Sequence, residues 1–205
     1  MFDGIIFDVD GTIWDSTPVV EKAWNAALEE AGYDERVTAD RLKGLFGLPM
    51  DDIIADILPQ ADAKERADFA PFCFKNEHDY LAETGGIVYD GVKELLETLS
   101  KTNKVFIVSN CQAGYIELMM DKTGFTPYVI DHLCPGDTDK LKADNIKIIC
   151  ERHNLNNPLY VGDTQMDANA CKEAGVPIAF AAYGFGKVKE PDYVINTPLE
   201  LLEIV

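Results

Sequence analysis

One stretch near the amino terminus constrains this chain more than any other: Gly-Ile-Ile-Phe-Asp-Val-Asp-Gly-Thr, residues 4–12. Its first four residues form a short apolar run, which predicts a strand buried on both faces. Asp8 and Asp10 follow at the carboxyl end, and their carboxylates point into the same space because strand side chains repeat every two residues. Like charges held that close repel, so one carboxyl would take up a proton unless a hard cation or an electrophilic phosphorus lay there. We therefore expect a metal-assisted acid/base pair.

The next residue, Gly11, lets the backbone turn tightly, so that the N–H groups of the loop can approach a ligand. The same run of residues would also fit an ordinary polar turn after a strand. The choice between these two interpretations depends on matching pieces further along the chain.

Two later apolar segments also end in polar residues. Residues 104–108 run into Ser109 and Asn110, which could bind a phosphate or simply cap the following helix. Residues 159–161 run into an acidic loop, Gly-Asp-Thr-Gln-Met-Asp, at residues 162–167. Each polar group thus follows an expected strand directly.

Further apolar segments at residues 128–130, 177–181 and 193–195 are separated by helical patterns. Strands that alternate with helices predict a parallel sheet, whose ligand crevice lies at the carboxyl ends of the strands. The expected fold class is α/β, with a doubly wound, Rossmann-like core. All the polar groups named above would meet at one edge of it.

Together these pieces resemble the haloacid dehalogenase superfamily of phosphatases, whose motifs are D-x-D-G-T, an apolar strand ending in Ser, a loop lysine, and an acidic G-D-x-x-x-D. The resemblance covers nearly the whole chain. It implies that Asp8 attacks phosphorus and that Asp10 acts as the acid and base. It also implies Mg2+ as cofactor, an ion that prefers oxygen ligands. The implied metal ligands are Asp8, Asp10, Asp163 and Asp167, and the implied phosphate-binding residues are Gly11, Thr12, Ser109, Asn110 and Lys142.

The lysine motif is the least certain of these matches. Both Lys140 and Lys142 lie in the loop, and Ala143 stands where relatives often have proline. Counting back from a helix expected to begin near Asn145 favours Lys142. The role of Asp167 is also open, since it could bind the metal directly, bind it through water or only orient its neighbours.

The chain changes to helical periodicity after the first motif. Thr17 is the expected N-cap of the first helix, with Pro18 at the first helical position. Further helices are expected over residues 39–45, around 53–58 and over 62–84. No buried strand is expected among these residues.

This helical stretch predicts a cap segment, residues 16–85, inserted into a core made of residues 1–15 and 86–205. The chain would cross between the two near residues 14–16 and 84–87. A helical cap at this position resembles the subfamily of phosphoglycolate phosphatase and beta-phosphoglucomutase. Such a cap closes over the site and excludes water.

Net charge and cysteine content limit the kinds of partner and compartment that we expect for this chain. The net charge is −18, so a nucleic acid or an anionic membrane is not expected to bind, and the site must concentrate positive charge locally. Five cysteines without C-x-x-C spacing, and no basic signal sequence, indicate a reduced, cytoplasmic chain without zinc or disulfides. We expect a monomer or homodimer that acts on a small phosphorylated metabolite.

The expected function, as the resemblance implies, is Mg2+-dependent hydrolysis of a small phosphate monoester through an aspartyl phosphate, similar to the activity of phosphoglycolate phosphatase. A dehalogenase of the superfamily lacks the second aspartate, so Asp10 counts against that activity. A sugar-phosphate mutase is an alternative, but it carries a cap histidine ten residues after the second aspartate, where this chain has Val20. A catalytically silent binding protein is the other alternative, and the intact acidic motifs count against it.

Overall fold

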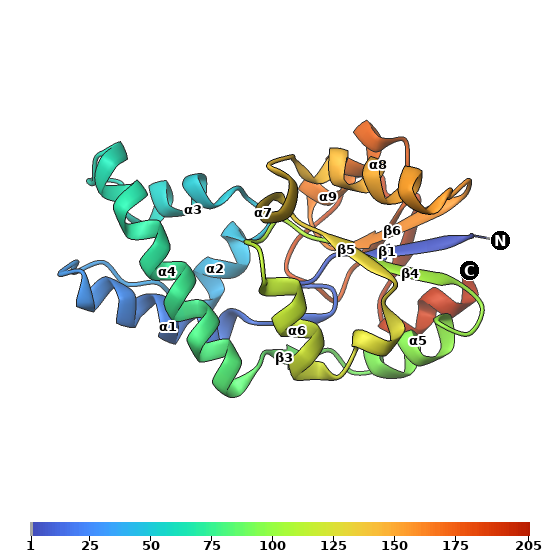
Figure 1. The fold of residues 1–205 in the computed structure, drawn as a ribbon, viewed down its shortest axis with the longest axis horizontal. Helices are drawn as coiled ribbons and strands as arrows, with labels where there is room; N and C mark the ends of the chain where they lie inside the picture. Colours follow the sequence, from blue (N-terminus) through green and yellow to red (C-terminus); the bar gives the residue numbers. More distant parts are fainter. Residues whose placement is uncertain (1) are drawn as a thin grey trace.

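A computed structural model describes residues 2–205, so Met1 of the expected core lies outside the described residues. Six strands form one parallel sheet in the order β5-β4-β1-β6-β7-β8 (Figure 1). The strands are β1 (Gly4–Phe7), β4 (Lys104–Val108), β5 (Asp131–Leu133), β6 (Pro158–Gly162), β7 (Ile178–Ala181) and β8 (Tyr193–Ile195). Helices connect them, which confirms the predicted α/β, Rossmann-like fold.

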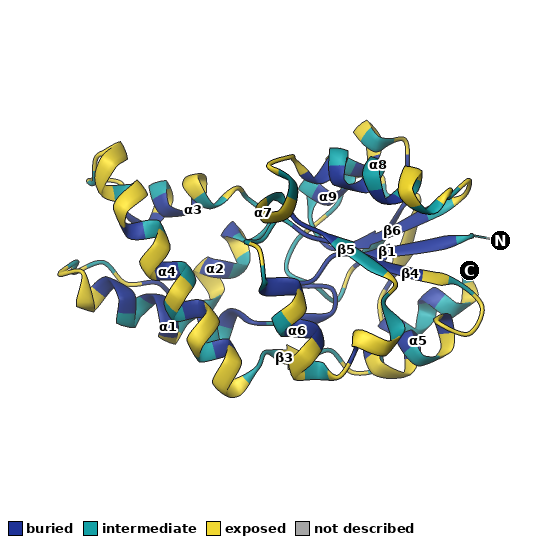
Figure 2. Ribbon diagram, viewed as in Figure 1, coloured by how far each residue is buried: buried dark blue, intermediate teal, exposed yellow. Residues whose placement is uncertain are grey.

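Different helices cover the two faces of the sheet. Ile5 and Phe7 of β1 pack into one hydrophobic cluster and Ile6 into another, as the two-residue repeat of a strand requires. The first cluster includes α5 (Val92–Leu99) and α6 (Tyr115–Thr123), and the second includes α8 (Lys142–His153) and α9 (Gln165–Ala174). Figure 2 shows these helices buried toward the sheet and exposed on the outside.

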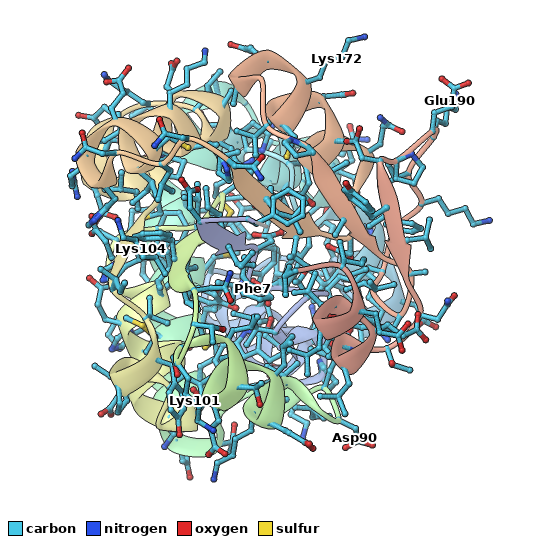
Figure 3. The ribbon with its side chains drawn as sticks, turned by 90° about the vertical axis from the view of Figure 1, so that its right-hand side faces the viewer. Phe7, Asp90, Lys101, Lys104, Lys172 and Glu190 are labelled. Atoms are coloured by element: carbon cyan, nitrogen blue, oxygen red, sulfur yellow. The ribbon has the colours of Figure 1, made fainter. Side chains whose placement is uncertain are left out.

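The strands at the centre of the sheet are therefore mainly apolar, and Lys104 at the start of β4 is exposed. In Figure 3 the labelled Phe7 lies in the interior, whereas the labelled charged residues Lys101, Lys172 and Glu190 lie at the periphery. Most of the buried ionisable side chains lie near the carboxyl ends of the strands, and Glu77 of α4 is an exception. No helix among residues 2–205 has the length and apolar character needed to span a bilayer.

Four helices follow the first motif and stand beside the sheet in Figure 1. They are α1 (Thr17–Glu30), α2 (Ala39–Leu45), α3 (Met50–Ile57) and α4 (Ala63–Thr84). The longest, α4, begins with a capping box: Asp62 accepts hydrogen bonds from the N–H groups of Lys64 and Glu65, and Glu65 accepts one from the Asp62 N–H. Its buried face packs along α1.

The chain enters and leaves this helical stretch through a two-stranded ribbon. Strand β2 (Trp14–Asp15) pairs antiparallel with β3 (Ile87–Val88). The two ends of the helical stretch therefore lie side by side. The division into a core of residues 1–15 and 86–205 and a cap segment of residues 16–85 stays our proposal.

Two predicted helix starts were displaced by a few residues. Ser16, not Thr17, is the N-cap of α1, because the Thr17 hydroxyl and N–H both donate to Asp15 Oδ1. Helix α8 begins at Lys142 rather than near Asn145. Helix α1 still follows the first motif, and α8 still precedes the acidic loop of residues 162–167, as predicted.

The strand expected near residues 128–130 lies slightly later in the chain. Tyr128 ends a short helix, η1 (Thr126–Tyr128), and the paired strand β5 covers residues 131–133. This strand is polar because it lies at the sheet edge, where Asp131 contacts Arg152 and His153. The remaining elements are α7 (Pro135–Thr138) and η2 (Pro198–Glu203).

Candidate active site

Three carboxylates meet where β1 and β6 end. These strands are adjacent and in register, with Phe7 opposite Val161, so the residues that follow them emerge together. Oxygen atoms of Asp8, Asp163 and Asp167 all lie within 4.8 Å of one another. Asp163 and Asp167 are completely buried and Asp8 is 4% exposed. The topology thus brings together residues that are more than 150 positions apart in the sequence.

The buried cation beside these acids is Lys142. Its Nζ lies 3.1 Å from Asp8 Oδ1 and 2.6 Å from Asp167 Oδ1. Lys140, the alternative from the sequence, is exposed. Because α8 begins at Lys142, this side chain leaves the first turn of the helix toward the sheet edge.

The charges of this cluster shift one another's titration. Burial by itself lowers the pKa of Lys142, but the charges of Asp167 and Asp8 outweigh burial and raise that pKa above its ordinary value. Burial would raise the pKa of Asp167, yet Lys142 and hydrogen bonds from Thr164 hold it below the ordinary value. Burial raises the pKa values of Asp8 and Asp163. The single positive charge of Lys142 therefore does not balance the negative charge that the three carboxylates would carry.

This imbalance fits a divalent cation. The clustered donors are all carboxylate oxygens, the ligands that Mg2+ prefers. Asp163 Oδ2 accepts a hydrogen bond from the Phe185 N–H at 2.6 Å, while the buried Asp163 Oδ1 accepts none from the described residues. A buried charged oxygen without a partner is costly unless a cation satisfies it. Asp8, Asp163 and Asp167 are thus the residues able to hold the metal.

The side chain of Asp10 lies apart from that trio. Its Oδ1 accepts hydrogen bonds from Ser16 Oγ at 2.5 Å and from the Tyr115 hydroxyl at 2.9 Å. Burial raises the pKa of Asp10 to about 7, although both hydrogen bonds act against the shift. A carboxyl that titrates near neutrality can both donate and accept a proton. Its environment suits acid/base chemistry, and its carboxylate is not one of the clustered oxygens.

The expected phosphate-binding residues line the same edge. Gly11 has a φ of 76°, and a Cβ there would collide with the Asp163 carboxylate, so only glycine fits. Ser109 is buried beside Asp8, and Thr12 is buried with a hydroxyl that has no hydrogen-bond partner among the described residues. Asn110 instead donates to the carbonyl of Gly47 at 3.0 Å. Its amide therefore reaches toward the helical segment.

Several residues of the site were not predicted from the sequence. Tyr115 and Ser16 hold Asp10, and the Phe185 N–H holds Asp163. A Cβ at Gly184 would collide with the Gly11 carbonyl and with Asp163. The position of Phe185 and its neighbours at a strand's carboxyl end was a usable signal, whereas nothing in the sequence singled out Tyr115.

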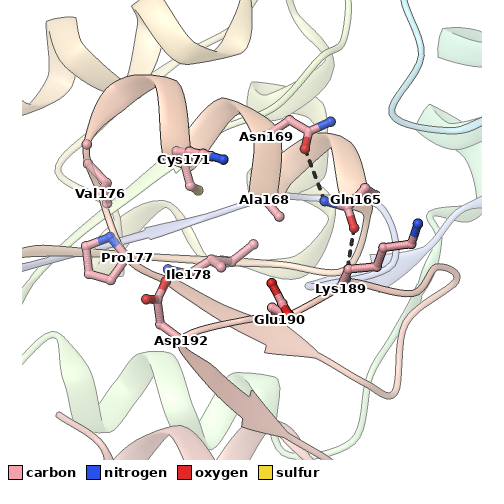
Figure 4. A pocket seen from close by; sticks show the side chains of 12 residues that line it. Gln165, Ala168, Asn169, Cys171, Val176, Pro177, Ile178, Lys189, Glu190 and Asp192 are labelled. Atoms are coloured by element: carbon pink, nitrogen blue, oxygen red, sulfur yellow. Dashed lines mark hydrogen bonds between the residues drawn. The ribbon is translucent and has the colours of Figure 1, made fainter.

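A small cavity of about 40 Å3 lies over the two aspartates of the first motif. Its walls include Ser109 from the core and Trp24 and Phe46 from the helical segment. A much larger hollow of about 590 Å3 lies elsewhere, between α9 and the segment of residues 189–192 (Figure 4). None of the acidic cluster lines it, and Gln165 there is hydrogen bonded to Asn169. The chemistry belongs to the smaller cavity.

Comparison with known proteins gives the family. Residues 5–181 match the family described as haloacid dehalogenase-like hydrolase. The chain therefore belongs to that family, as its motifs predicted.

Similar proteins give the reaction class. The chain is 28% identical to a phosphoglycolate phosphatase of Photobacterium profundum, covering 100% of this chain and 97% of that protein. It is 26% identical to an N-acetylmuramic acid 6-phosphate phosphatase of Pseudomonas putida, covering 98% and 95%. A haloacid dehalogenase-like family hydrolase from Streptococcus pneumoniae has the same fold, with a TM-score of 0.84, 22% identity and coverage of 99% and 98%. The chain is a phosphatase of this family, a phosphoric monoester hydrolase.

Proposed function

We propose that this protein is a Mg2+-dependent phosphatase that cleaves a small phosphate monoester through a phosphorylated Asp8. The observation that carries the proposal is the buried group of Asp8, Asp163 and Asp167, with Lys142 as the one cation in contact with it among residues 2–205. A divalent cation held by these carboxylates would supply the positive charge that draws a phosphoryl group to Asp8. An acidic protein surface makes such a local charge necessary.

The reaction takes two steps on the chain's own residues. A carboxylate oxygen of Asp8 bonds to phosphorus, the bond from phosphorus to the ester oxygen breaks, and Asp10 gives its proton to the departing alkoxide. Asp10 then takes a proton from a water molecule, whose oxygen attacks phosphorus and releases phosphate from Asp8. Lys142 Nζ and the N–H groups of Val9 and Asp10 stabilise the phosphoryl oxygens, since the N–H groups of Gly11 and Thr12 already donate to the Trp14 and Val9 carbonyls.

The cap segment has a role in this proposal as well. The catalytic cavity, about 40 Å3, has room for only the phosphoryl end of an ester or for a few water molecules. We infer that residues 16–85 move as a unit on the ribbon of β2 and β3 to admit substrate. Closure then excludes water from the ester until Asp8 has reacted.

Release of phosphate from p-nitrophenyl phosphate, with and without Mg2+, tests the proposal. We expect activity that EDTA abolishes, that added Mg2+ restores, and that Asp8→Asn removes. Asp144→Asn, which alters a half-exposed carboxylate on the surface of α8, is the matched control and should leave activity unchanged. Hydrolysis that survives Asp8→Asn, or that needs no metal, would show the mechanism to be wrong. Interconversion of sugar-phosphate isomers without phosphate release would indicate a mutase instead.

A further inference from the structure

We propose that the substrate's leaving group is uncharged and apolar, so that this phosphatase discriminates against monoesters carrying a second anionic group. This inference rests on the proposed function and adds the class of substrate. Its basis is a second hollow that continues the catalytic cavity and that offers a ligand almost no charge.

The second hollow has a volume of about 300 Å3 and shares a wall with the catalytic cavity. Leu48, Met50 and Ile53 of the cap segment, and residues 110–112 of the core, line both spaces. An ester whose phosphoryl group lies at Asp8 would therefore extend its remainder into this hollow. We call it the leaving-group chamber.

The chamber is lined mainly by apolar side chains. Beyond the shared wall these include Pro49 and Phe74 of the cap segment and Leu141 of the core. Leu141 is 69% exposed, a high value for a large apolar residue, and marks the mouth. Burying an apolar ligand against such a lining removes apolar surface from water on both sides, which favours binding.

No Lys, Arg or His is among the described residues that line the chamber or the catalytic cavity. Lys43 of the cap segment is not in the lining: its Nζ lies 3.4 Å from Asp15 Oδ2 and 5.8 Å from the centre of the Phe185 ring. Lys142 belongs to the phosphoryl end of the site. A carboxylate on the leaving group would consequently be buried without a counter-charge, which is strongly unfavourable.

The polar groups of the chamber are also unsuited to an anion. The side-chain amide of Gln112 already donates to Glu77 at 3.0 Å, and that of Asn110 already donates to the Gly47 carbonyl. Each amide keeps one further N–H, which is a neutral donor, and Asn110 Oδ1 is an acceptor with no partner among the described residues. An acceptor oxygen repels a carboxylate but can take a hydrogen bond from a hydroxyl. Glu77, behind Gln112, adds a further acidic group on this side.

Matched pairs of esters test this inference. Phenyl phosphate and 4-carboxyphenyl phosphate differ by one carboxylate, and the carboxylate makes the phenol the slightly better leaving group. We expect kcat/KM with Mg2+ to favour phenyl phosphate by at least about ten-fold, and ethyl phosphate to be favoured similarly over phosphoglycolate. Among linear alkyl phosphates, kcat/KM should rise about four-fold for each methylene up to the length of the chamber.

A charge placed in the wall gives an independent test. Met50→Lys puts a cation on the half-buried wall, and should narrow the preference for phenyl over 4-carboxyphenyl phosphate by about ten-fold. Ile130→Lys makes the same kind of change at an exposed site that lines neither space, and should leave the ratio as it is. If Met50→Lys does not fold, the paired esters still test whether the enzyme prefers an uncharged leaving group.

The outcomes separate this inference from the proposed function. Equal or better turnover of the carboxylated esters, with p-nitrophenyl phosphate still cleaved through Asp8, would overturn the uncharged leaving group alone. An unchanged ratio in a folded Met50→Lys variant would show that the leaving group does not lie along this wall. Failure to cleave any monoester in the presence of Mg2+ would overturn the phosphatase function and this inference with it.

Discussion

Replacing Glu77 by glutamine should stabilise the protein at alkaline pH. Glu77 lies on α4 and is 5% exposed, and its carboxylate accepts hydrogen bonds from Trp24 Nε1 at 2.8 Å and from Gln112 Nε2 at 3.0 Å. Burial raises the pKa of Glu77 to about 7, from an ordinary value of 4.5, even though both hydrogen bonds act against the shift. Ionising this buried carboxyl therefore lowers the stability of the folded state, because no cation among the described residues contacts it.

The size of the effect follows from the pKa difference. The folded state holds the proton of Glu77 more tightly than the unfolded state does, so the free energy of unfolding falls as the pH rises from about 4.5 to about 7. A pKa difference of about 2.5 units corresponds to a loss of about 3 kcal/mol in the free energy of unfolding. This destabilisation is absent below about pH 4.5 and reaches its full size above about pH 7. In Glu77→Gln the new amide oxygen accepts from Trp24, and Gln112 turns its carbonyl oxygen toward the new amide group.

Urea unfolding of the metal-free protein and of Glu77→Gln, from pH 5 to pH 8.5, measures this effect. We expect the variant to exceed the wild type by about 3 kcal/mol at pH 8 and to match it within about 1 kcal/mol at pH 5. Comparing the two proteins at each pH removes the contributions of the other buried acids. A variant that is less stable at pH 8, or whose difference does not change with pH, would refute the reasoning.

Three other substitutions test the site. Lys142→Met leaves the buried acids without their cation, so it should lower the free energy of unfolding of the metal-free protein by about 3–5 kcal/mol. Saturating Mg2+ should restore part of this loss. Urea unfolding with and without Mg2+ measures both effects. Gly184→Ala forces a methyl group against Asp163 and should cost about 1–3 kcal/mol and weaken Mg2+ binding in calorimetric titration. Tyr115→Phe removes a hydrogen bond that lowers the pKa of Asp10, so the alkaline limb of the kcat/KM profile should move to higher pH.

Each substitution has a control of the same kind. Lys147→Met removes a half-exposed surface lysine of the same helix and should cost less than about 1 kcal/mol. Gly44→Ala adds a methyl group in open space within a helix. Tyr128→Phe removes a hydroxyl that donates to Glu97, away from the site. The structural explanation would be contradicted if a control substitution had the same measured effect as its test variant. It would also be contradicted if Mg2+ did not change the stability of Lys142→Met.

Much of this site could be anticipated because parallel strands share one direction. Short apolar runs predicted strands, and residues directly after such strands must meet at one edge of a parallel sheet whatever their separation in the chain. Asp8 and Asp163 could therefore be grouped before any coordinates were known. The helical stretch from residue 17 to residue 84 was equally visible, since its periodicity is regular and Pro18 and Gly85 mark its two ends.

Contacts that depend on side-chain direction could not be anticipated. Tyr115 reaches Asp10 across 105 positions of the sequence, and no local pattern marks a hydroxyl that points from α6 toward β1. The choice between Lys140 and Lys142 depended on where α8 begins, and helix boundaries are the least certain part of a sequence-based prediction. Burial, which raises the pKa of Asp10, is also a property of the packed molecule.

The sequence by itself determined the fold class, the family and the set of acidic residues, because these follow from periodicity and from motifs at strand ends. Only the tertiary structure decided which carboxylates cluster, which lysine compensates them and what surrounds the ester. Those features arise where the cap segment and the core meet, between segments whose distance in space is set by packing rather than by their order in the chain.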